Sequence, residues 1–350
     1  MLRDRYRIVE LVGAGGGGAV YRADDLRLAG RVTAVKEIRS DPNAGPELVG
    51  DIQAQFRREA ETLARLDHPA LPKVSDYFEI GGTHYLVMDF VTGPDLRQVV
   101  NRARAQGAFL DERQVTDWSL QLLDALAYLH GRTPSVVHRD VKPANIKLVE
   151  GSRIKLVDFG LVKPLDPADP RTVTVARGVG SLPYTPLEQY AGDTGHTDPR
   201  SDLYALGATM YHLLTGATPA TAQERFLSPS ALARPRRLNP SISAAVESIV
   251  LAAMSLHPDR RPADAAEMAA QLRDRVTVAE PNERAPDAAA VARAWRHGVV
   301  ENGGLLALVA FLLLLAALAT WQSQADSETP TRATPATTEI SARPSDPSAR

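Results

Sequence analysis

Two short polar motifs on either side of a hairpin pattern constrain this chain more than any other feature. Residues 138–145 read HRDVKPAN, and residues 158–160 read DFG. Between them, residues 146–149 and 154–157 are short runs rich in apolar residues, separated by a Glu-Gly-Ser turn. Runs of this kind around a glycine turn predict a β-hairpin that carries both motifs at the same end.

Four side chains of these motifs form a set suited to phosphoryl transfer to a hydroxyl group. Asp140 would orient the hydroxyl and accept its proton, and Lys142 would neutralise charge beside the transferred group. Asn145 and Asp158 would hold Mg²⁺ on the phosphates. A hairpin with merely charged loops is the alternative, but the length and order of the combined motif favour phosphoryl transfer.

The motifs resemble those of the Hanks-type serine/threonine protein kinases of bacteria over roughly residues 6–275. The Lys142-Pro143 pair resembles the residues that the serine/threonine branch of the family has at these positions. The resemblance implies an α+β, bilobal protein-kinase fold: an N-lobe of β-sheet plus one helix, αC, over residues 1–91, and a mainly helical C-lobe over residues 92–275. It also implies ATP between the lobes, Mg²⁺ or alternatively Mn²⁺, and serine or threonine hydroxyls of proteins as substrates.

Two other functions compete with this interpretation. A pseudokinase would use the same fold as a binding module without turnover, but every chemical group of the motif is present. A small-molecule kinase of related fold generally lacks a segment as long as residues 160–188 after the DFG motif. Both alternatives are therefore disfavoured.

A glycine-rich stretch near the start of the chain fits the pattern G-x-G-x-x-G-x-V through Gly13, Gly15, Gly18 and Val20. A dinucleotide-binding fold would need a helix next, with an acid about 20 residues further on. The sequence instead continues as a strand, which favours a hairpin whose glycine amides approach phosphates. In the family that the chain resembles, Val20 and Ala34 would cover the adenine.

Lys36 lies in a predicted strand over residues 31–38 that resembles the V-A-I-K motif. By resemblance, Lys36 would hold the phosphates of ATP. A predicted helix over residues 52–66 follows, and its Glu59 matches the glutamate that orients this lysine. Glu61 is the competing candidate.

The resemblance also assigns the adenine and ribose contacts. Met88 would close the back of the adenine pocket, and the segment from Asp89 to Val91 would form the hinge. Asp95 lies where the family binds ribose, although it could equally cap the next helix. Lys147 departs from the family, because an apolar residue usually forms the floor of the adenine site. Its aliphatic stem can still cover a ring while the amine reaches water.

The segment after the DFG motif resembles an activation segment. Arg139 would belong to a basic pocket that receives a phosphate on Thr172 or Thr174, so we expect autophosphorylation of this loop. Ser181 stands where the family has threonine, and Thr185 stands where it has alanine. The hydroxyl of Ser181 is expected to contact the catalytic loop.

Two further residues would brace this region. Glu188 is expected to pair with Arg261. Asp202 opens a predicted apolar helix and matches the buried aspartate that holds the backbone of the catalytic loop.

Composition limits the partners. A net charge of −2 over 350 residues argues against nucleic acid. The chain has no cysteine, which excludes disulfides and thiolate chemistry. Protein substrates are expected, and the sequence leaves open whether the chain forms a homodimer.

The C-terminal part has the pattern of a membrane anchor. Residues 276–302 read as a linker, and residues 303–321 contain no charged residue. A helix needs about 20 residues to cross a bilayer, so residues 303–321 predict a transmembrane helix, with a buried soluble helix as the disfavoured alternative. Arg293 and Arg296 precede it, which places the kinase in the cytoplasm of a single-pass membrane protein. Residues 322–350, rich in Pro, Ser and Thr, predict a disordered extracytoplasmic tail.

Overall fold

The computed structural model describes residues 1–15, 18–38, 57, 60–158, 163–164, 179–190 and 198–278. These residues belong to one compact unit, Met1–Glu280, and Pro281–Arg350 form a second unit. Glu59, Thr172, Thr174 and the predicted transmembrane segment lie outside the described residues. Within the described ranges, no helix combines the length and apolar character needed to cross a bilayer.

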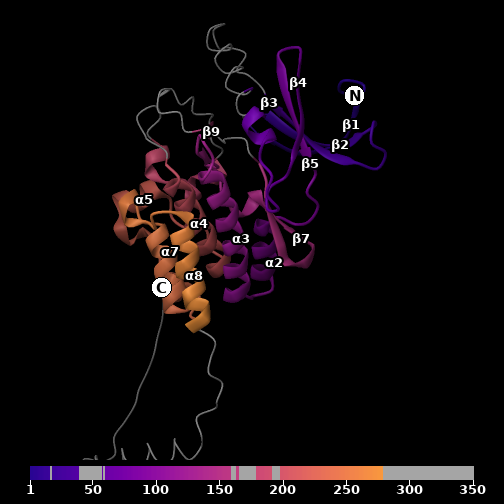
Figure 1. The fold of residues 1–350 in the computed structure, drawn as a ribbon. Helices are drawn as coiled ribbons and strands as arrows, with labels where there is room; N and C mark the ends of the chain where they lie inside the picture. Colours follow the sequence, from indigo (N-terminus) through magenta and orange to yellow (C-terminus); the bar gives the residue numbers. More distant parts are fainter. Residues whose placement is uncertain are drawn as a thin grey trace, which may run out of the picture. The chain divides into compact units, whose positions relative to one another are not determined.

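The N-terminal part is a five-stranded antiparallel sheet in the order β1-β2-β3-β5-β4 (Figure 1). Its strands are β1 (Tyr6–Gly15), β2 (Gly18–Asp25), β3 (Val32–Ile38), β4 (Val74–Ile80) and β5 (Thr83–Asp89). Strands β4 and β5 are joined by Gly81 and Gly82, both at positive φ (58° and 79°). Glycine adopts such angles without steric cost, which permits a two-residue hairpin turn. Strands β1 and β2 also pair antiparallel, with Gly15 opposite Gly18, so the predicted strand hairpin at the glycine-rich stretch is confirmed.

The two faces of this sheet are buried differently. On one face, Tyr6, Val35, Phe78 and Val87 form a small separate core, in which the Tyr6 and Phe78 rings stack 5.7 Å apart. The opposite face contributes Met88 and its neighbours Ala34 and Leu86 to the large core shared with the helices. The sheet is therefore fixed to the helical part through the strands that carry Lys36 and Met88.

The C-terminal part is mainly helical (Figure 1). Its helices are α2 (Leu96–Ala105), α3 (Glu112–His130), α4 (Arg200–Thr215), α5 (Ala222–Leu227), α6 (Pro235–Leu238), α7 (Ala244–Ala253) and α8 (Ala265–Val278). On α3, Trp118, Leu122, Leu126 and Leu129 lie at helical spacing and are fully buried. Helix α4 is buried on all sides from Ser201 to Thr215 and packs against α3 and α7. Helix α4 thus forms the centre of this lobe.

Side-chain caps set the starts of α7 at Ala244 and of α8 at Ala265. The side chain of Ser243 accepts a hydrogen bond from the amide of Val246, and Asp264 accepts one from Glu267. These side chains satisfy first-turn amides, which fixes the start of each helix.

The hairpin between the two polar motifs is confirmed. Strands β7 (Ile146–Val149) and β8 (Arg153–Leu156) pair antiparallel around a 3₁₀ turn, η2 (Glu150–Ser152). Because Ile146 pairs with Leu156, Asn145 and Asp158 flank the same end of the hairpin. Short strand β6 (Val136–Val137), which leads into the catalytic loop, pairs with β9 (Lys163–Pro164).

Candidate active site

The side chains of the first motif converge on one carboxylate oxygen. The ammonium of Lys142 donates to Oδ2 of Asp140 at 2.7 Å, and the amide of Asn145 donates to the same atom at 2.9 Å. Lys142 also donates to the hydroxyl of Ser181 at 2.6 Å. No described residue donates a hydrogen bond to the other oxygen of Asp140, Oδ1. The arrangement holds the carboxylate and leaves one oxygen for a further partner.

A buried aspartate on α4 holds the backbone of this loop, as predicted. Asp202 accepts hydrogen bonds from the backbone amides of His138 at 2.8 Å and Arg139 at 2.7 Å. Nε2 of His130, at the end of α3, donates to it at 2.9 Å. Burial raises the pKa of Asp202, but the bond from His130 and the nearby donors outweigh burial and hold that pKa below its ordinary value. The brace is therefore an ionised carboxylate.

The backbone around the catalytic aspartate is unusual. Arg139 adopts φ of +68° and Asp158 adopts φ of +69°. Non-glycine residues rarely adopt this region, and such conformations concentrate at functional sites. The Asp202 bond to the Arg139 amide is one of the contacts that fixes the first of these two residues.

Asp158 and Lys36 form an ion pair that links β3 to the end of the hairpin. Burial raises the pKa of Asp158, but the charge and hydrogen bond of Lys36 outweigh burial and lower it. The backbone oxygen of Asn145 accepts a hydrogen bond from the amide of Val157 at 2.7 Å, so Asn145 and Asp158 are held on adjoining segments. An ionised carboxylate and an amide oxygen are hard donors, which fit Mg²⁺.

The partner expected for Lys36, Glu59, lies outside the described residues, so their pairing stays a prediction. The competing candidate Glu61 is exposed and forms no ion pair with any described residue. In the described part of the chain, Lys36 pairs with Asp158.

The glycines of the first hairpin differ in what surrounds them. A Cβ at Gly18, where φ is +140°, would lie 1.8 Å from the backbone oxygen of Glu37. Gly18 is therefore needed for the close approach of β2 and β3. A Cβ at Gly13 would meet no described atom within 4 Å. Gly15 is paired with Gly18 across the hairpin.

On the adenine side, Ala34 and Met88 are direct neighbours across β3 and β5, and Val20 packs against the same core. The backbone amide of Asp89 donates to the oxygen of Lys73, so the predicted hinge begins as sheet backbone. Val91 follows two residues later, and its predicted contact with adenine stays a prediction.

The segment after the hinge is held by Asp95 and Lys147. Asp95 accepts a hydrogen bond from the amide of Gln98 at 2.8 Å and forms a capping box at the start of α2. Its capping role is thus observed, and its contact with ribose stays a prediction. The ammonium of Lys147 donates to the oxygen of Gly93 at 3.3 Å. The ammonium of Lys147 is therefore bound to the backbone that follows the hinge.

The predicted pair beyond the activation segment is confirmed. The guanidinium of Arg261 donates two hydrogen bonds to Glu188, at 2.6 and 3.0 Å, and the hydroxyl of Ser201 adds a third at 2.8 Å. Burial raises the pKa of Glu188, but Arg261 outweighs burial and holds it below the ordinary value. A forked ion pair of this kind fixes both position and orientation.

Several contacts near the site were not predicted. His130 donates to Asp202, and the hydroxyl of Tyr184 shares a hydrogen bond of 2.7 Å with Nδ1 of His212. Thr185 donates to the backbone oxygen of Ser181 at 3.0 Å. Sequence spacing gives no signal for the pairs between α3, α4 and the activation segment, because they join residues from 28 to 72 positions apart.

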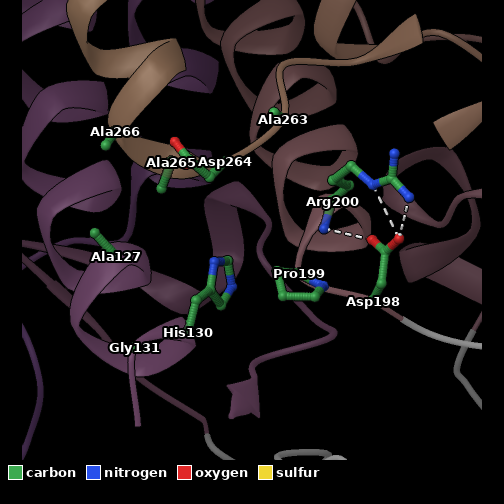
Figure 2. A pocket seen from close by; sticks show the side chains of 10 residues that line it. All are labelled: Ala127, His130, Gly131, Asp198, Pro199, Arg200, Ala263, Asp264, Ala265 and Ala266. Carbon is green, nitrogen blue, oxygen red and sulfur yellow. Dashed lines mark hydrogen bonds and ion pairs between the residues drawn. The ribbon is translucent and has the colours of Figure 1, made fainter. Parts of the chain in front are cut away.

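A separate open cavity of about 430 Å³ lies where the end of α3 meets the starts of α4 and α8 (Figure 2). Four of its ten lining residues are alanines, and the others include His130 and the pair of Asp198 and Arg200, which bond to each other at 2.7 Å. None of the phosphoryl-transfer side chains lines it. This cavity is therefore not the predicted nucleotide site.

Comparison with known proteins agrees with the geometry. The protein kinase domain model matches residues 6–293. A probable serine/threonine-protein kinase of Streptomyces coelicolor is 35% identical over 280 residues, which cover 76% of this chain and 39% of the relative. Serine/threonine-protein kinase PknB of Mycolicibacterium smegmatis is 35% identical over 284 residues, which cover 77% of this chain and 43% of the relative. The chain spans about two fifths of the length of these curated relatives.

A crystal structure of the PknI kinase domain of Mycobacterium tuberculosis matches with a TM-score of 0.59 and 28% identity, covering 78% of this chain and 96% of that one. The bilobal fold and the family model thus agree on the same part of the chain. The chain belongs to the protein kinase domain family.

Proposed function

We propose that this protein is a serine/threonine protein kinase, which transfers the γ-phosphoryl group of ATP to hydroxyl groups of proteins. The observation that carries the proposal is the arrangement around Asp140. Lys142 and Asn145 both bind its Oδ2, and Oδ1 accepts no hydrogen bond from a described residue. An oriented carboxylate with one oxygen available can receive the proton of a substrate hydroxyl.

The remaining groups supply charge stabilisation. Lys142 lies between Asp140 and the segment that carries Ser181, where it would neutralise the transferred phosphoryl group. Lys36 would bind phosphate oxygens of ATP. Asn145 and Asp158 would hold Mg²⁺, which when bound offsets the charge of the phosphates. Whether Mn²⁺ serves equally is part of the test below.

The experiment is a transfer assay on the purified full-length chain with labelled ATP, Mg²⁺ or Mn²⁺, and a generic protein substrate. If the protein is a protein kinase, serine and threonine residues of the substrate become labelled, and this labelling is lost when Asp140 is replaced by Asn. ATP binding without any transfer would instead support a pseudokinase, and transfer to metabolites but not to protein would support a small-molecule kinase.

We also propose that the chain is anchored in the cell membrane by residues 303–321, with the kinase in the cytoplasm and residues 322–350 outside it. The uncharged stretch and the arginines before it support this placement. A further part of the proposal is autophosphorylation at Thr172 or Thr174, with Arg139 binding the phosphate. Its support is the charge chemistry of a phosphate beside an arginine.

A further inference from the structure

Thr185 directly follows the short turn that carries Ser181. This 3₁₀ turn, η3 (Val179–Tyr184), contains Pro183, which has no amide hydrogen to donate. The hydroxyl of Thr185 donates to the backbone oxygen of Ser181 at 3.0 Å, and its own amide donates to the oxygen of Leu182 at 3.1 Å. Thr185 and Ser181 are 5% and 6% exposed, so water competes little for this bond.

The same serine reaches the catalytic carboxylate. Its hydroxyl binds the ammonium of Lys142 at 2.6 Å, and Lys142 binds Asp140 at 2.7 Å. A continuous set of contacts therefore runs from Thr185 through Ser181 and Lys142 to Asp140. Thr185 and Ser181 are buried, and Lys142 and Asp140 are partly buried, so limited contact with water strengthens these hydrogen bonds.

Thr185 makes two separate bonds to this turn, one from its amide and one from its hydroxyl. The backbone bond from the Thr185 amide does not depend on the side chain and already closes the turn. The hydroxyl therefore adds a contact to Ser181 that the turn itself does not require.

We propose that Thr185 is a positioning residue for phosphoryl transfer: its hydroxyl fixes Ser181, so that the Ser181 hydroxyl holds Lys142 against Asp140. The inference rests on the proposed kinase function. Its effect falls on the chemical step, because Lys142 and Asp140 act on the transferred group and the hydroxyl. Binding of ATP, which involves Lys36 and the opposite lobe, should change little.

The test compares full-length Thr185→Val, which keeps the volume and loses the donor, with Thr185→Ser, which keeps the donor. Loss of one buried hydrogen bond should lower kcat for a protein substrate about three- to tenfold, with KM for ATP unchanged within about twofold. Thr185→Ser should keep kcat close to that of the parent. Thr185→Ala provides a second variant without the donor if the valine variant folds poorly.

Thr215→Val is the matched control. Thr215 is 6% exposed, and its hydroxyl donates to the backbone oxygen of Tyr211 at 2.7 Å, away from Asp140. It should lower the melting temperature without lowering kcat. In a Ser181→Ala background, Thr185→Val should cause no further loss, because the route through the Ser181 hydroxyl is already gone.

A parental kcat in Thr185→Val, or an undiminished further loss in the Ser181→Ala background, would overturn the positioning role. An inactive parent protein would contradict the proposed kinase function instead, so the two failures are distinguishable.

Discussion

Asp202 accepts a hydrogen bond from the backbone amide of Arg139 at 2.7 Å, which ties the residue before the catalytic aspartate to the central helix. Because Arg139 has a positive φ, this bond helps to hold a backbone conformation that is otherwise unfavourable. One buried carboxylate thus links the stability of α4 to the geometry of the catalytic loop.

Asp202→Asn should therefore lower both the stability of the protein and its catalytic rate. The amide can accept only through its one oxygen, so at least one of the three donors loses its partner. We expect a loss of unfolding free energy of about 2–3 kcal/mol and a fall in kcat of at least about tenfold. Urea unfolding and steady-state kinetics measure the two effects. Asp264→Asn, which keeps a good helix cap, is the control and should change neither strongly.

Asp140→Asn and Asp158→Asn should fail in different ways. The first removes the proton acceptor and should keep ATP binding, whereas the second removes a metal ligand and should lose Mg²⁺-dependent ATP affinity. Either change should lower the rate at least about 10²-fold, because positioning and charge stabilisation supply most of the rate. Calorimetric ATP titrations with and without Mg²⁺, beside the transfer assay, separate the two. Parental transfer by Asp140→Asn would rule out the proposed mechanism.

The ion pair of Glu188 and Arg261 should make stability depend on pH in acid. Burial raises the pKa of Glu188, but Arg261 outweighs it, so the folded-state pKa lies below the ordinary value of 4.5. The pair therefore stabilises the protein fully above pH 4.5, and this contribution is lost as the pH falls through the folded-state pKa.

Glu188→Gln should lower stability at neutral pH and flatten the fall below 4.5. Urea midpoints measured across this pH range test the expectation. Glu61→Gln, at an exposed position, should follow the parent curve. Parallel curves for the parent and Glu188→Gln would show that the pair contributes no pH dependence.

Autophosphorylation at Thr172 or Thr174 should raise activity several-fold. A phosphate adds about −1.5 to −2 charges and can bind an arginine such as Arg139 through forked hydrogen bonds. Mass spectrometry of the active protein should find the phosphate, and a Thr172→Ala/Thr174→Ala double mutant should lose the increase. An unmodified loop in the active protein, with unchanged activity in the mutant, would contradict this regulation and leave the catalytic proposal intact.

Membrane anchoring predicts a defined topology. A reporter fused after Arg350 should be active only outside the cytoplasm, and one fused before Met1 only inside it. Deletion of residues 303–321 should release an active kinase into the soluble fraction. Recovery of the intact chain in that fraction would count against the anchor.

The parts predictable from sequence are those governed by local chemistry or by an ordered motif. The hairpin between Asn145 and Asp158 follows from two short runs rich in apolar residues and a glycine turn. The pair of Glu188 and Arg261 followed from a family pattern, since no local rule joins residues 73 positions apart. Neither a local rule nor a family pattern predicts the contact of Tyr184 with His212, because it depends on how the activation segment packs against α4.

Gly18 and Gly13 differ in whether the fold itself requires a glycine, so only one of them can indicate whether a related chain is still an active kinase. A side chain at Gly18 would separate β2 from β3, so a catalytically dead descendant would still need glycine there in order to fold. Gly13 has no such internal reason, since the described part of the chain leaves open space where its Cβ would be. In inactive descendants, Gly13 can therefore be replaced while Gly18 is retained, so a substitution at Gly13 is the one that indicates lost activity.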